Sequence, residues 1–367
     1  MTDGIHTVLI VNDEAAHWQG YRDRLARESG AESVSIAVPP GDRRDSIVAT
    51  LGNKLRTVTD DPYDLLAREK PQLAVITVPP LDAPPVIDAC LDVGAHVLVE
   101  KPAAVIDSDL EPLARKALDR ERHLMLAFAG SQQPIVRDAA RVIRADKALG
   151  TLYGVTAHYL ADQTRVRDVE QLERRTGSST GWFFKKRFGG GGHLSWRGIH
   201  FVDMLRAVTG HDIAEVAAMT NLAGGQPIDV EDSAVLTLRY DNGVLASLTC
   251  GYYLDQHDVE DDKQSLFKVW GEHGWLEMDP HEGTPLQWYS NRPEAAVQPR
   301  RRQEYDTDFL AGYDTLMHEA IGAAAGHNAP PVATLDSLQA LRVVHAAYRA
   351  AETGRVQRVP PRGQWSD

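Results

Sequence analysis

The chain has 367 residues, of which 43% are hydrophobic and 25% charged, and its formal net charge is -13. This length predicts two domains with ample core, and the acidic balance argues against nucleic-acid binding, because phosphates require a concentrated basic surface. The only cysteines, Cys90 and Cys250, provide neither a disulfide framework nor a metal-ligand spacing. No apolar run approaches the roughly 18 residues of a membrane span, and the N-terminus lacks the regions of a signal peptide. We therefore expect a cytoplasmic protein.

Short apolar runs alternate with helical runs in the first third of the chain. We expect strands over residues 6–11, 33–38, 56–58, 73–78, 96–99 and 124–127, and helices over 18–27, 61–69, 84–93 and 108–121. This alternation is typical of an open, doubly wound α/β sheet with parallel strands. We expect this domain to occupy residues 1–128.

The rest of the chain changes towards the two-residue period of strands. After a helix over 135–145, we expect strands over 153–159, 213–220, 233–240, 244–251, 267–270, 275–278 and 286–289. Asp241-Asn242-Gly243 predicts a hairpin, residues 257–263 and 293–302 are expected to be charged loops, and helices over 309–325 and 334–352 close the chain, the second ending at Gly354. We expect a C-terminal α+β domain over 129–367 with a large, mostly antiparallel open sheet. Its last helix is available to pack back on the N-terminal domain.

The stretch from Val78 to Pro102 carries the first candidate site residues. Val78-Pro79-Pro80 follows one buried strand and Glu100-Lys101-Pro102 follows the next. Both segments are expected at the carboxyl edge of the parallel sheet, where such sheets bind ligands. Lys101, held by a proline of fixed φ, is placed where a reacting group is needed. The alternative interpretation is a solvated lysine that ends a strand.

The link between the first strand and the first helix departs from the usual dinucleotide-binding pattern. Residues 12–17 contain none of the glycines of G-x-G-x-x-G, which let backbone amides approach a pyrophosphate. We expect Asn12 or Asp13 to make the turn and to cap the following helix.

The second strand also lacks an expected residue, namely the acid that binds a ribose diol. Beyond its end stand Pro39 and then the pair Arg43 and Arg44. Such a pair tolerates a 2′-phosphate, and the alternative interpretation is a solvated turn with two surface arginines.

A second group of candidates lies between residues 181 and 203. Four glycines, Gly189 to Gly192, lead into an amphipathic helix on which His200 and Asp203 are three residues apart. Glycines permit unusual backbone angles and close approach of a ligand. The alternative for His200 is a core or interface histidine bonded to Asp203. No second ligand cluster accompanies the histidines, so we expect no metal.

The other candidates in this group also have two interpretations. His193 and Arg197 are read either as site residues or as surface residues, and Trp196 either as a ligand contact or as a packed side chain.

Four motifs in this order resemble the glucose–fructose oxidoreductase/inositol dehydrogenase (Gfo/Idh/MocA) family. They are Pro-Pro after one strand, G-x-H-V-x-x-E-K-P after the next, a distant Gly-Gly-Gly with G-x-H-x-x-D, and the helical segment Ala347–Arg355. The resemblance implies an N-terminal Rossmann domain and a C-terminal α/β domain whose open sheet covers the active site and often mediates oligomerisation. It implies NAD(P)-dependent oxidation or reduction of a sugar, polyol or sugar-acid-like compound.

The resemblance also assigns roles to residues. Lys101 matches the lysine that contacts nicotinamide and the reacting hydroxyl, and His200 matches the active-site histidine. Trp196 stands where the family commonly carries an acid. The remaining substrate contacts expected are Arg197, Asp203 and His193. The cofactor contacts expected are Asn12, Asp13, Pro39, Arg43, Val78, Pro79, Pro80, Glu100, Lys101 and Gln132.

These residues support oxidation of a secondary alcohol by NAD or NADP. Lys101 stabilises the developing alkoxide as a nearby cation, and His200 takes the proton. One alternative keeps the nicotinamide but is redox-neutral overall, giving elimination, epimerisation or glycoside cleavage. Another is a ligand-binding regulator without catalysis. We expect a homodimer or homotetramer formed through the C-terminal sheet, and neither a nucleic acid nor a membrane as partner.

Overall fold

The structure is a computed structural model that describes residues 4–162, 180–224, 228–254, 263–280, 285–293, 298–305 and 310–365. The expected charged loop over 257–263 lies almost wholly outside the described residues. The chain divides into two compact units. Unit 1 comprises Met1–Phe128, Val169–Gly190 and Tyr313–Leu338, and unit 2 comprises Ala129–Asp168, Gly191–Gly312 and Gln339–Asp367.

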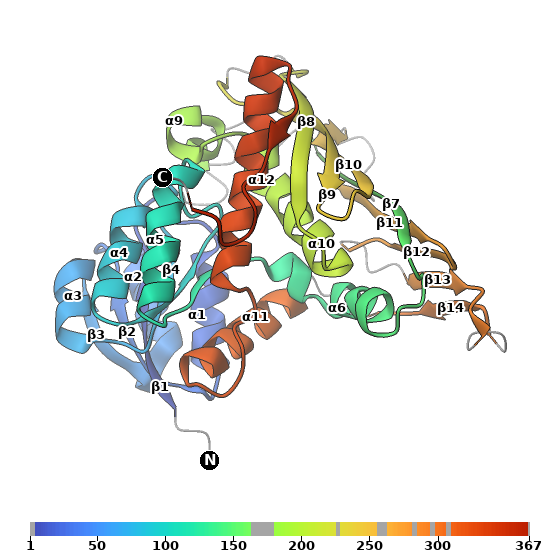
Figure 1. Ribbon diagram of the computed structural model, residues 1–367. Helices are drawn as coiled ribbons and strands as arrows, with labels where there is room; N and C mark the ends of the chain where they lie inside the picture. Colours follow the sequence, from blue (N-terminus) through green and yellow to red (C-terminus); the bar gives the residue numbers. More distant parts are fainter. Residues whose placement is uncertain are drawn as a thin grey trace. The chain divides into compact units, whose positions relative to one another are not determined.

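Unit 1 contains a six-stranded parallel sheet in the order β3-β2-β1-β4-β5-β6. Figure 1 labels β1 to β4 of this sheet. Its strands are β1 (Ile5–Ile10), β2 (Ala31–Ala37), β3 (Leu55–Thr59), β4 (Leu73–Ile76), β5 (His96–Val99) and β6 (Leu124–Leu126). The central strands are buried along nearly their whole length, as continuous apolar runs require when helices cover both faces. The expected doubly wound sheet is confirmed.

The helices of this sheet follow the expected ranges with one addition. They are α1 (Trp18–Arg27), α2 (Asp42–Leu51), α3 (Pro62–Glu69), α4 (Ala83–Asp92) and α5 (Asp107–Asp119), with a 3₁₀ turn, η1 (Gly52–Lys54), after α2. The start of α3 is set by Asp61, whose carboxylate accepts the N–H groups of Tyr63 and Asp64. Helix α2 was not predicted from the sequence.

Three later segments complete unit 1: η4 (Thr180–Phe184) with α9 (Lys186–Gly189), most of α11 (Leu310–Ala324), and the start of α12 (Thr334–Thr353). The edge strand β6 is protected by α12, because the Thr334 and Ser337 hydroxyls accept the Leu124 and Leu126 N–H groups, each at 3.0 Å.

Unit 2 contains a nine-stranded sheet in the order β14-β13-β12-β11-β7-β10-β9-β8-β15. The strands are β7 (Leu152–Asp162), β8 (Ile213–Asn221), β9 (Ser233–Tyr240), β10 (Leu245–Leu254), β11 (Lys263–Gly271), β12 (Gly274–Met278), β13 (Leu286–Ser290), β14 (Arg300–Gln303) and β15 (Gln357–Arg358). Neighbouring strands are antiparallel except β7 and β10, which confirms the expected mostly antiparallel sheet. The prediction of a loop up to Arg302 was wrong at its end, because β14 pairs with β13.

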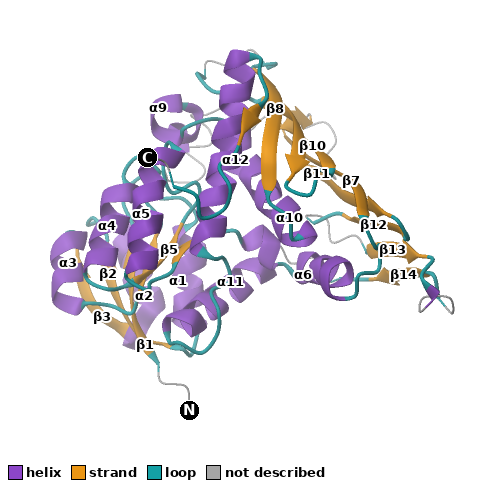
Figure 2. Ribbon diagram, in the orientation of Figure 1, coloured by secondary structure: helices purple, strands orange, loops and turns teal. Residues whose placement is uncertain are grey.

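One face of this sheet is covered and the other is exposed. The helical segments of unit 2, η2 (Ala129–Gln132), α6 (Pro134–Ala140), η3 (Arg141–Ala145), η5 (Leu194–Gly198) and α10 (Ile199–Thr209), lie on the covered side, as Figure 2 shows for α6 and α10. Side chains alternate accordingly along β9, where every second residue is buried. The opposite face exposes large apolar side chains, including Met219 at 81% and Leu245 at 51%.

Candidate functional site

The carboxyl ends of β4 and β5 bring the two segments of the first constellation side by side. Ile76 pairs with Val99, and the Glu100 N–H donates to the Ile76 carbonyl at 2.8 Å. Lys101 is only 2% exposed. The interpretation of Lys101 as a solvated strand end is therefore wrong, and a cation is enclosed at the sheet edge where such folds bind ligands.

The Glu100 carboxylate is held by residues that the sequence analysis did not single out. The Tyr21 hydroxyl donates to Oε1 at 2.6 Å, His17 Nδ1 lies 3.2 Å from the same oxygen, and Oε2 accepts the Lys101 N–H at 3.1 Å. Burial pushes the pKa of Glu100 upward, but His17, Lys101 and Tyr21 outweigh it and leave that pKa lowered. Glu100 is therefore an anion beside Lys101.

The loop after β1 satisfies its own backbone. The side-chain oxygen of Asn12 accepts the Glu14 N–H at 3.1 Å, and the Asn12 carbonyl accepts the Ala15 N–H at 3.2 Å. The capping prediction was wrong, since the N-cap of α1 is His17 and no side chain caps that helix. Two amides that a glycine loop would offer to a pyrophosphate are thus already bonded within the protein.

Arg43 and Arg44 lie in the first turn of α2 rather than in a solvated turn, so that interpretation was wrong. Arg43 donates to the carbonyls of Asn12 and Asp13, the latter at 3.1 Å, and Arg44 donates from Nε to the Val38 carbonyl at 2.9 Å. The Arg43 guanidinium also lies 5.4 Å from the ring centre of Trp18, at the start of α1. Pro39, by contrast, follows β2 with its side chain partly exposed.

The residues of the loop after β1 and of the sheet edge fit a nicotinamide dinucleotide, although the hydrogen-bond donors differ from the glycine amides that usually bind its pyrophosphate. Val78, Pro79, Pro80, Glu100 and Lys101 are all buried at the sheet edge. The guanidinium of Arg43 and the first turn of α1 bring positive charge to the loop after β1, where the glycine amides of G-x-G-x-x-G are missing. The loop is further fixed by Trp182, whose indole N–H donates to the Glu14 carbonyl at 3.0 Å.

In unit 2 the glycine segment is packed against protein atoms. A Cβ at Gly191 would lie 2.0 Å from the Tyr348 hydroxyl oxygen, and one at Gly192 would lie 1.9 Å from the Glu231 carbonyl oxygen. The missing side chains at Gly191 and Gly192 therefore leave room for Tyr348 and Glu231, and not for a ligand.

Glu231 anchors the segment that carries the second constellation. Its carboxylate accepts the N–H groups of Gly192 and Leu194 at 2.8 and 2.9 Å and the Tyr348 hydroxyl at 2.8 Å. Tyr348 in turn accepts the Ser195 N–H at 3.1 Å. These contacts fix the turn η5 and the start of α10.

A small pocket in unit 2 gathers part of the predicted substrate site. His200 and Arg197 line it together with Tyr159, Met204 and Gly130. His200 is half-buried on α10, and its Nδ1 lies near the backbone of Gly130.

The other predicted residues of unit 2 are buried beside this pocket and do not line it. Trp196 is 9% and Asp203 5% exposed, and Gln132 is buried in η2, where its amide donates to Ser131. The fully buried His193 is stacked on Tyr159, with ring centres 5.5 Å apart.

The environment of His193 is apolar enough to keep its ring neutral. Neither ring nitrogen has a hydrogen-bond partner among the described residues. Burial, with a smaller contribution from Arg197, lowers the pKa of His193 to about 3. The interpretation of His193 as a surface residue is wrong.

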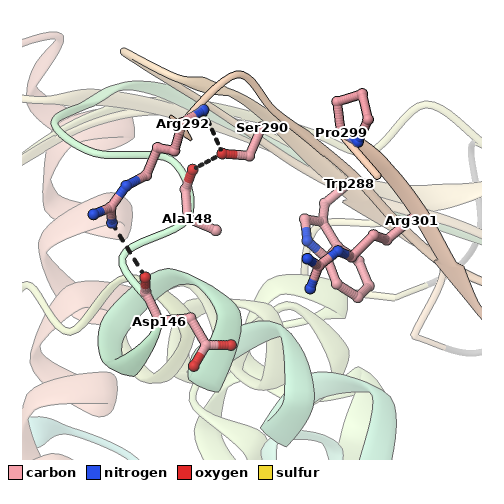
Figure 3. A pocket seen from close by; sticks show the side chains of 7 residues that line it. All are labelled: Asp146, Ala148, Trp288, Ser290, Arg292, Pro299 and Arg301. Atoms are coloured by element: carbon pink, nitrogen blue, oxygen red, sulfur yellow. Dashed lines mark hydrogen bonds between the residues drawn. The ribbon is translucent and has the colours of Figure 1, made fainter. Parts of the chain in front are cut away.

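A second pocket in unit 2 contains none of the predicted site residues (Figure 3). It lies between β13, β14 and the turn after η3, and Arg292, Arg301 and Trp288 form much of its wall. Arg292 donates to the carbonyls of Asp146 and Lys147 at 3.3 and 2.9 Å, so its guanidinium is bonded to the backbone of the neighbouring turn.

Within the described ranges, no cluster of three or more histidine, cysteine, aspartate or glutamate side chains has the arrangement of a metal site. None of the helices described is both long and apolar enough to cross a membrane.

A doubly wound parallel sheet with a buried lysine and carboxylate at its carboxyl edge, followed in the chain by a nine-stranded open sheet, places the protein among the α/β proteins that bind ligands at that edge. The family model described as "Oxidoreductase family, NAD-binding Rossmann fold" matches residues 14–128, and the one described as "GFO/IDH/MocA C-terminal domain" matches residues 136–277. The chain belongs to the Gfo/Idh/MocA family of NAD(P)-dependent dehydrogenases and reductases.

Named relatives are distant but extend over most of the chain. Myo-inositol dehydrogenase Hyg17 of Streptomyces leeuwenhoekii is 27% identical, covering 78% of this chain and 81% of its own. The 1,5-anhydro-D-fructose reductase of Ensifer adhaerens is 26% identical and covers 74% of each chain. Among solved structures, levoglucosan dehydrogenase in complex with NADH and levoglucosan has a TM-score of 0.81 at 17% identity, covering 97% of this chain and 99% of its own. That likeness shows the fold.

Proposed function

We propose that the protein transfers a hydride between the nicotinamide of NAD(P) and a hydroxyl-bearing carbon of a sugar, polyol or sugar-acid-like substrate. The observation that carries the proposal is the enclosure of Lys101, 2% exposed, next to the anionic Glu100 at the sheet edge. A buried lysine is costly unless a charge or ligand compensates it. Family membership supplies the reaction class.

Lys101 and His200 divide the work of activating the hydroxyl. The Lys101 ammonium stabilises negative charge on the alcohol oxygen as its proton leaves. His200 accepts that proton during oxidation and returns it during reduction. The nicotinamide ring, when bound, accepts or supplies the hydride.

The cofactor is held by residues of unit 1. We assign Val78, Pro79, Pro80, Glu100 and Lys101 to its nicotinamide end. Asn12, Asp13, Pro39 and Arg43 are assigned to its pyrophosphate and adenosine end, and Gln132 of unit 2 remains a further proposed contact. Arg43 contributes here both as a cation and as the residue that ties the loop carbonyls.

The substrate is a small polyhydroxylated compound. Relatives named for myo-inositol, 1,5-anhydro-D-fructose and levoglucosan share this chemistry. Arg197, which lines the pocket with His200, favours a substrate with an acidic group. Trp196, His193 and Asp203 are buried and do not line that pocket, so we assign them to shaping it, with little direct contact with the substrate.

We also propose that the protein is a homodimer or homotetramer formed through the exposed face of the nine-stranded sheet. Met219, Leu245, Val235 and Trp270 are 81%, 51%, 48% and 40% exposed on four different strands of it. Register places Met219 beside Val235 and both on one face, so they form an apolar surface of the kind that partners cover.

The first experiment is a titration with NADH and NADPH followed by nicotinamide fluorescence. Turnover is then measured on myo-inositol, levoglucosan, 1,5-anhydro-D-fructose and their acidic analogues. Lys101→Met and His200→Ala should each lower kcat by at least ~100-fold, the lower end of general acid–base effects. The exposed-residue controls Lys147→Met and His327→Ala should retain wild-type turnover.

Three results would contradict the proposal. Unchanged turnover in both Lys101→Met and His200→Ala would remove the catalytic roles. Turnover without net change in nicotinamide absorbance would instead identify the redox-neutral alternative. Cofactor or sugar binding with no turnover on the whole panel would identify a ligand-binding regulator.

A further inference from the structure

The Glu100 carboxylate connects the loop after β1 to the proposed catalytic lysine. On one side, Oε2 accepts the backbone N–H of Lys101 at 3.1 Å. On the other, Oε1 accepts the Tyr21 hydroxyl at 2.6 Å and faces His17 Nδ1 at 3.2 Å. Because both oxygens are engaged, the carboxylate and the peptide that precedes the Lys101 side chain are held in one orientation.

His17 occupies a backbone position that suits glycine. Counted from Asn12, the three glycines of G-x-G-x-x-G would fall at Asn12, Glu14 and His17. The backbone of His17 has φ 56°, in the left-handed region that glycine adopts freely and other residues adopt at a cost. Compared with glycine at this position, the His17 imidazole adds the contact with the Glu100 carboxylate.

The two donors are supported from a separate helix of unit 1. The ring of Tyr313 on α11 lies edge-on to His17 and Tyr21, with ring centres 6.3 and 5.9 Å apart. The Arg24 guanidinium lies 5.3 Å from the Tyr313 ring centre and pairs with Asp314 at 2.9 Å. The titratable groups in contact with His17 are thus Glu100 after β5 and Tyr313 on α11, and these two groups in turn interact with Lys101, Tyr21 and Arg24.

We propose that His17 and Tyr21 are positioning residues that act through Glu100 to orient Lys101. The loop that other dinucleotide folds use only to hold the pyrophosphate therefore also sets the geometry of the catalytic lysine. This inference rests on the proposed catalytic role of Lys101. If the loop only held the cofactor, substitutions in it would change cofactor affinity and the chemical step together. If His17 and Tyr21 orient Lys101, substituting them changes the chemical step and leaves cofactor affinity in place.

His17→Gly is the decisive variant, because it restores the third glycine and removes the imidazole. The NADH dissociation constant, measured by fluorescence, should stay equal or become tighter, since the backbone relaxes and bulk is removed. The kcat should fall about tenfold, which converts to about 1.4 kcal/mol, near the lower end of what a hydrogen bond to a charged group contributes. His17→Gln keeps a donor within reach of Glu100 and should recover most of kcat.

Tyr21→Phe tests the second donor with little change of shape. Its kcat should also fall about tenfold with an unchanged NADH dissociation constant. Tyr63→Phe is the matched control, because Tyr63 is 50% exposed and lies on a different helix, α3. The melting temperature of each variant shows whether it is folded.

The pH profile separates positioning from a merely structural effect. Burial pushes the pKa of Glu100 upward, but the pKa is lowered overall, and the hydrogen bond from Tyr21 is among the interactions that lower it. Without the Tyr21 hydroxyl, the pKa of Glu100 rises, so the acid limb of kcat/KM in Tyr21→Phe should move to higher pH. A structural role would lower the melting temperature and leave that limb in place.

The outcomes distinguish this inference from the proposed function. If Lys101→Met is inactive while His17→Gly and Tyr21→Phe keep full kcat, the positioning role is refuted and the function stands. If His17→Gly raises kcat together with cofactor affinity, His17 only fills the glycine position and the inference fails. If Lys101→Met retains full turnover, both fail together.

Discussion

Replacement of Glu231 by alanine tests whether the glycine segment is held by one buried acceptor. Glu231 accepts two backbone N–H groups, from Gly192 and Leu194, and the hydroxyl of Tyr348. Each buried donor left without a partner costs about 1–3 kcal/mol. With three donors affected and partial rescue by entering water, we expect a loss of about 3–6 kcal/mol, a large part of a typical ~5–15 kcal/mol stability.

The assay combines global unfolding with a local probe, because a chain of two units need not unfold in one step. Urea or thermal unfolding should show the loss, and hydrogen exchange should accelerate at the amides of Gly192 and Leu194. Glu272→Ala is the matched control. Glu272 also accepts a backbone N–H, that of Thr151 at 3.4 Å, but it is exposed. Its loss should stay below about 1 kcal/mol.

The same residue predicts a pH dependence of stability. Burial, only partly offset by the hydrogen bonds from Leu194, Gly192 and Tyr348, raises the pKa of Glu231. The folded protein therefore keeps this proton at pH values where the unfolded chain, with a glutamate pKa of about 4.3, has lost it. The contribution of Glu231 to stability falls as pH rises from the unfolded pKa through the folded one.

Glu231→Gln should remove that slope. Unchanged melting and unchanged exchange at the two amides in Glu231→Ala would refute the anchoring role. A Glu231-dependent slope of opposite sign would refute the pKa argument.

Two further predictions concern the cofactor loop and the open sheet. Arg43→Ala should weaken NADH and NADPH binding equally, about tenfold by fluorescence titration, because Arg43 donates hydrogen bonds to carbonyls of the loop after β1. A loss of affinity confined to NADPH would show instead that Arg43 binds a 2′-phosphate. Met219→Asp combined with Leu245→Asp should lower the oligomeric mass in light scattering, whereas Val58→Asp, at a 39% exposed residue of β3, should not; an unchanged mass in the double variant would exclude this face as the interface.

Local pattern was sufficient for most of the fold. Helix α1 begins at Trp18 as expected because its apolar residues recur at helical spacing, and β9 was predicted from strict alternation. The hairpin at Asp241-Asn242-Gly243 formed because Gly243 takes φ 87° without strain. In each case one short segment contains the whole signal.

Elements without such a signal were missed. Helix α2 buries only Ile47 and Leu51, so its sequence has no broad apolar stripe. Strand β14 consists of three arginines and a glutamine, which read as a basic loop, and it exists because its backbone pairs with β13. Edge pairing of this kind depends on the neighbouring strand and is not encoded in the side chains of the strand itself.

The candidate site shows the same difference between residues that stand in a local motif and residues that do not. Lys101 and His200 were proposed from the sequence because they stand in short motifs at predicted element ends. Their supporting residues were not, since Tyr21 and Glu100 are 79 residues apart and Glu231 and Tyr348 are 117 apart. A carboxylate's partners are chosen by tertiary structure, and residue spacing contains no information about them.

The two glycine-dependent segments show when such a residue can be replaced. In the loop after β1, the side chain of Asn12 accepts the Glu14 N–H and Arg43 holds the carbonyls, so other residues took over what the glycines do for the backbone. At Gly192 no such substitution is available, because a Cβ would fall 1.9 Å from the backbone carbonyl oxygen of Glu231. A glycine required by conformation can be exchanged at a cost, as His17 shows, whereas one required by contact cannot. The absence of the phosphate-loop glycines is therefore compatible with an intact dinucleotide fold.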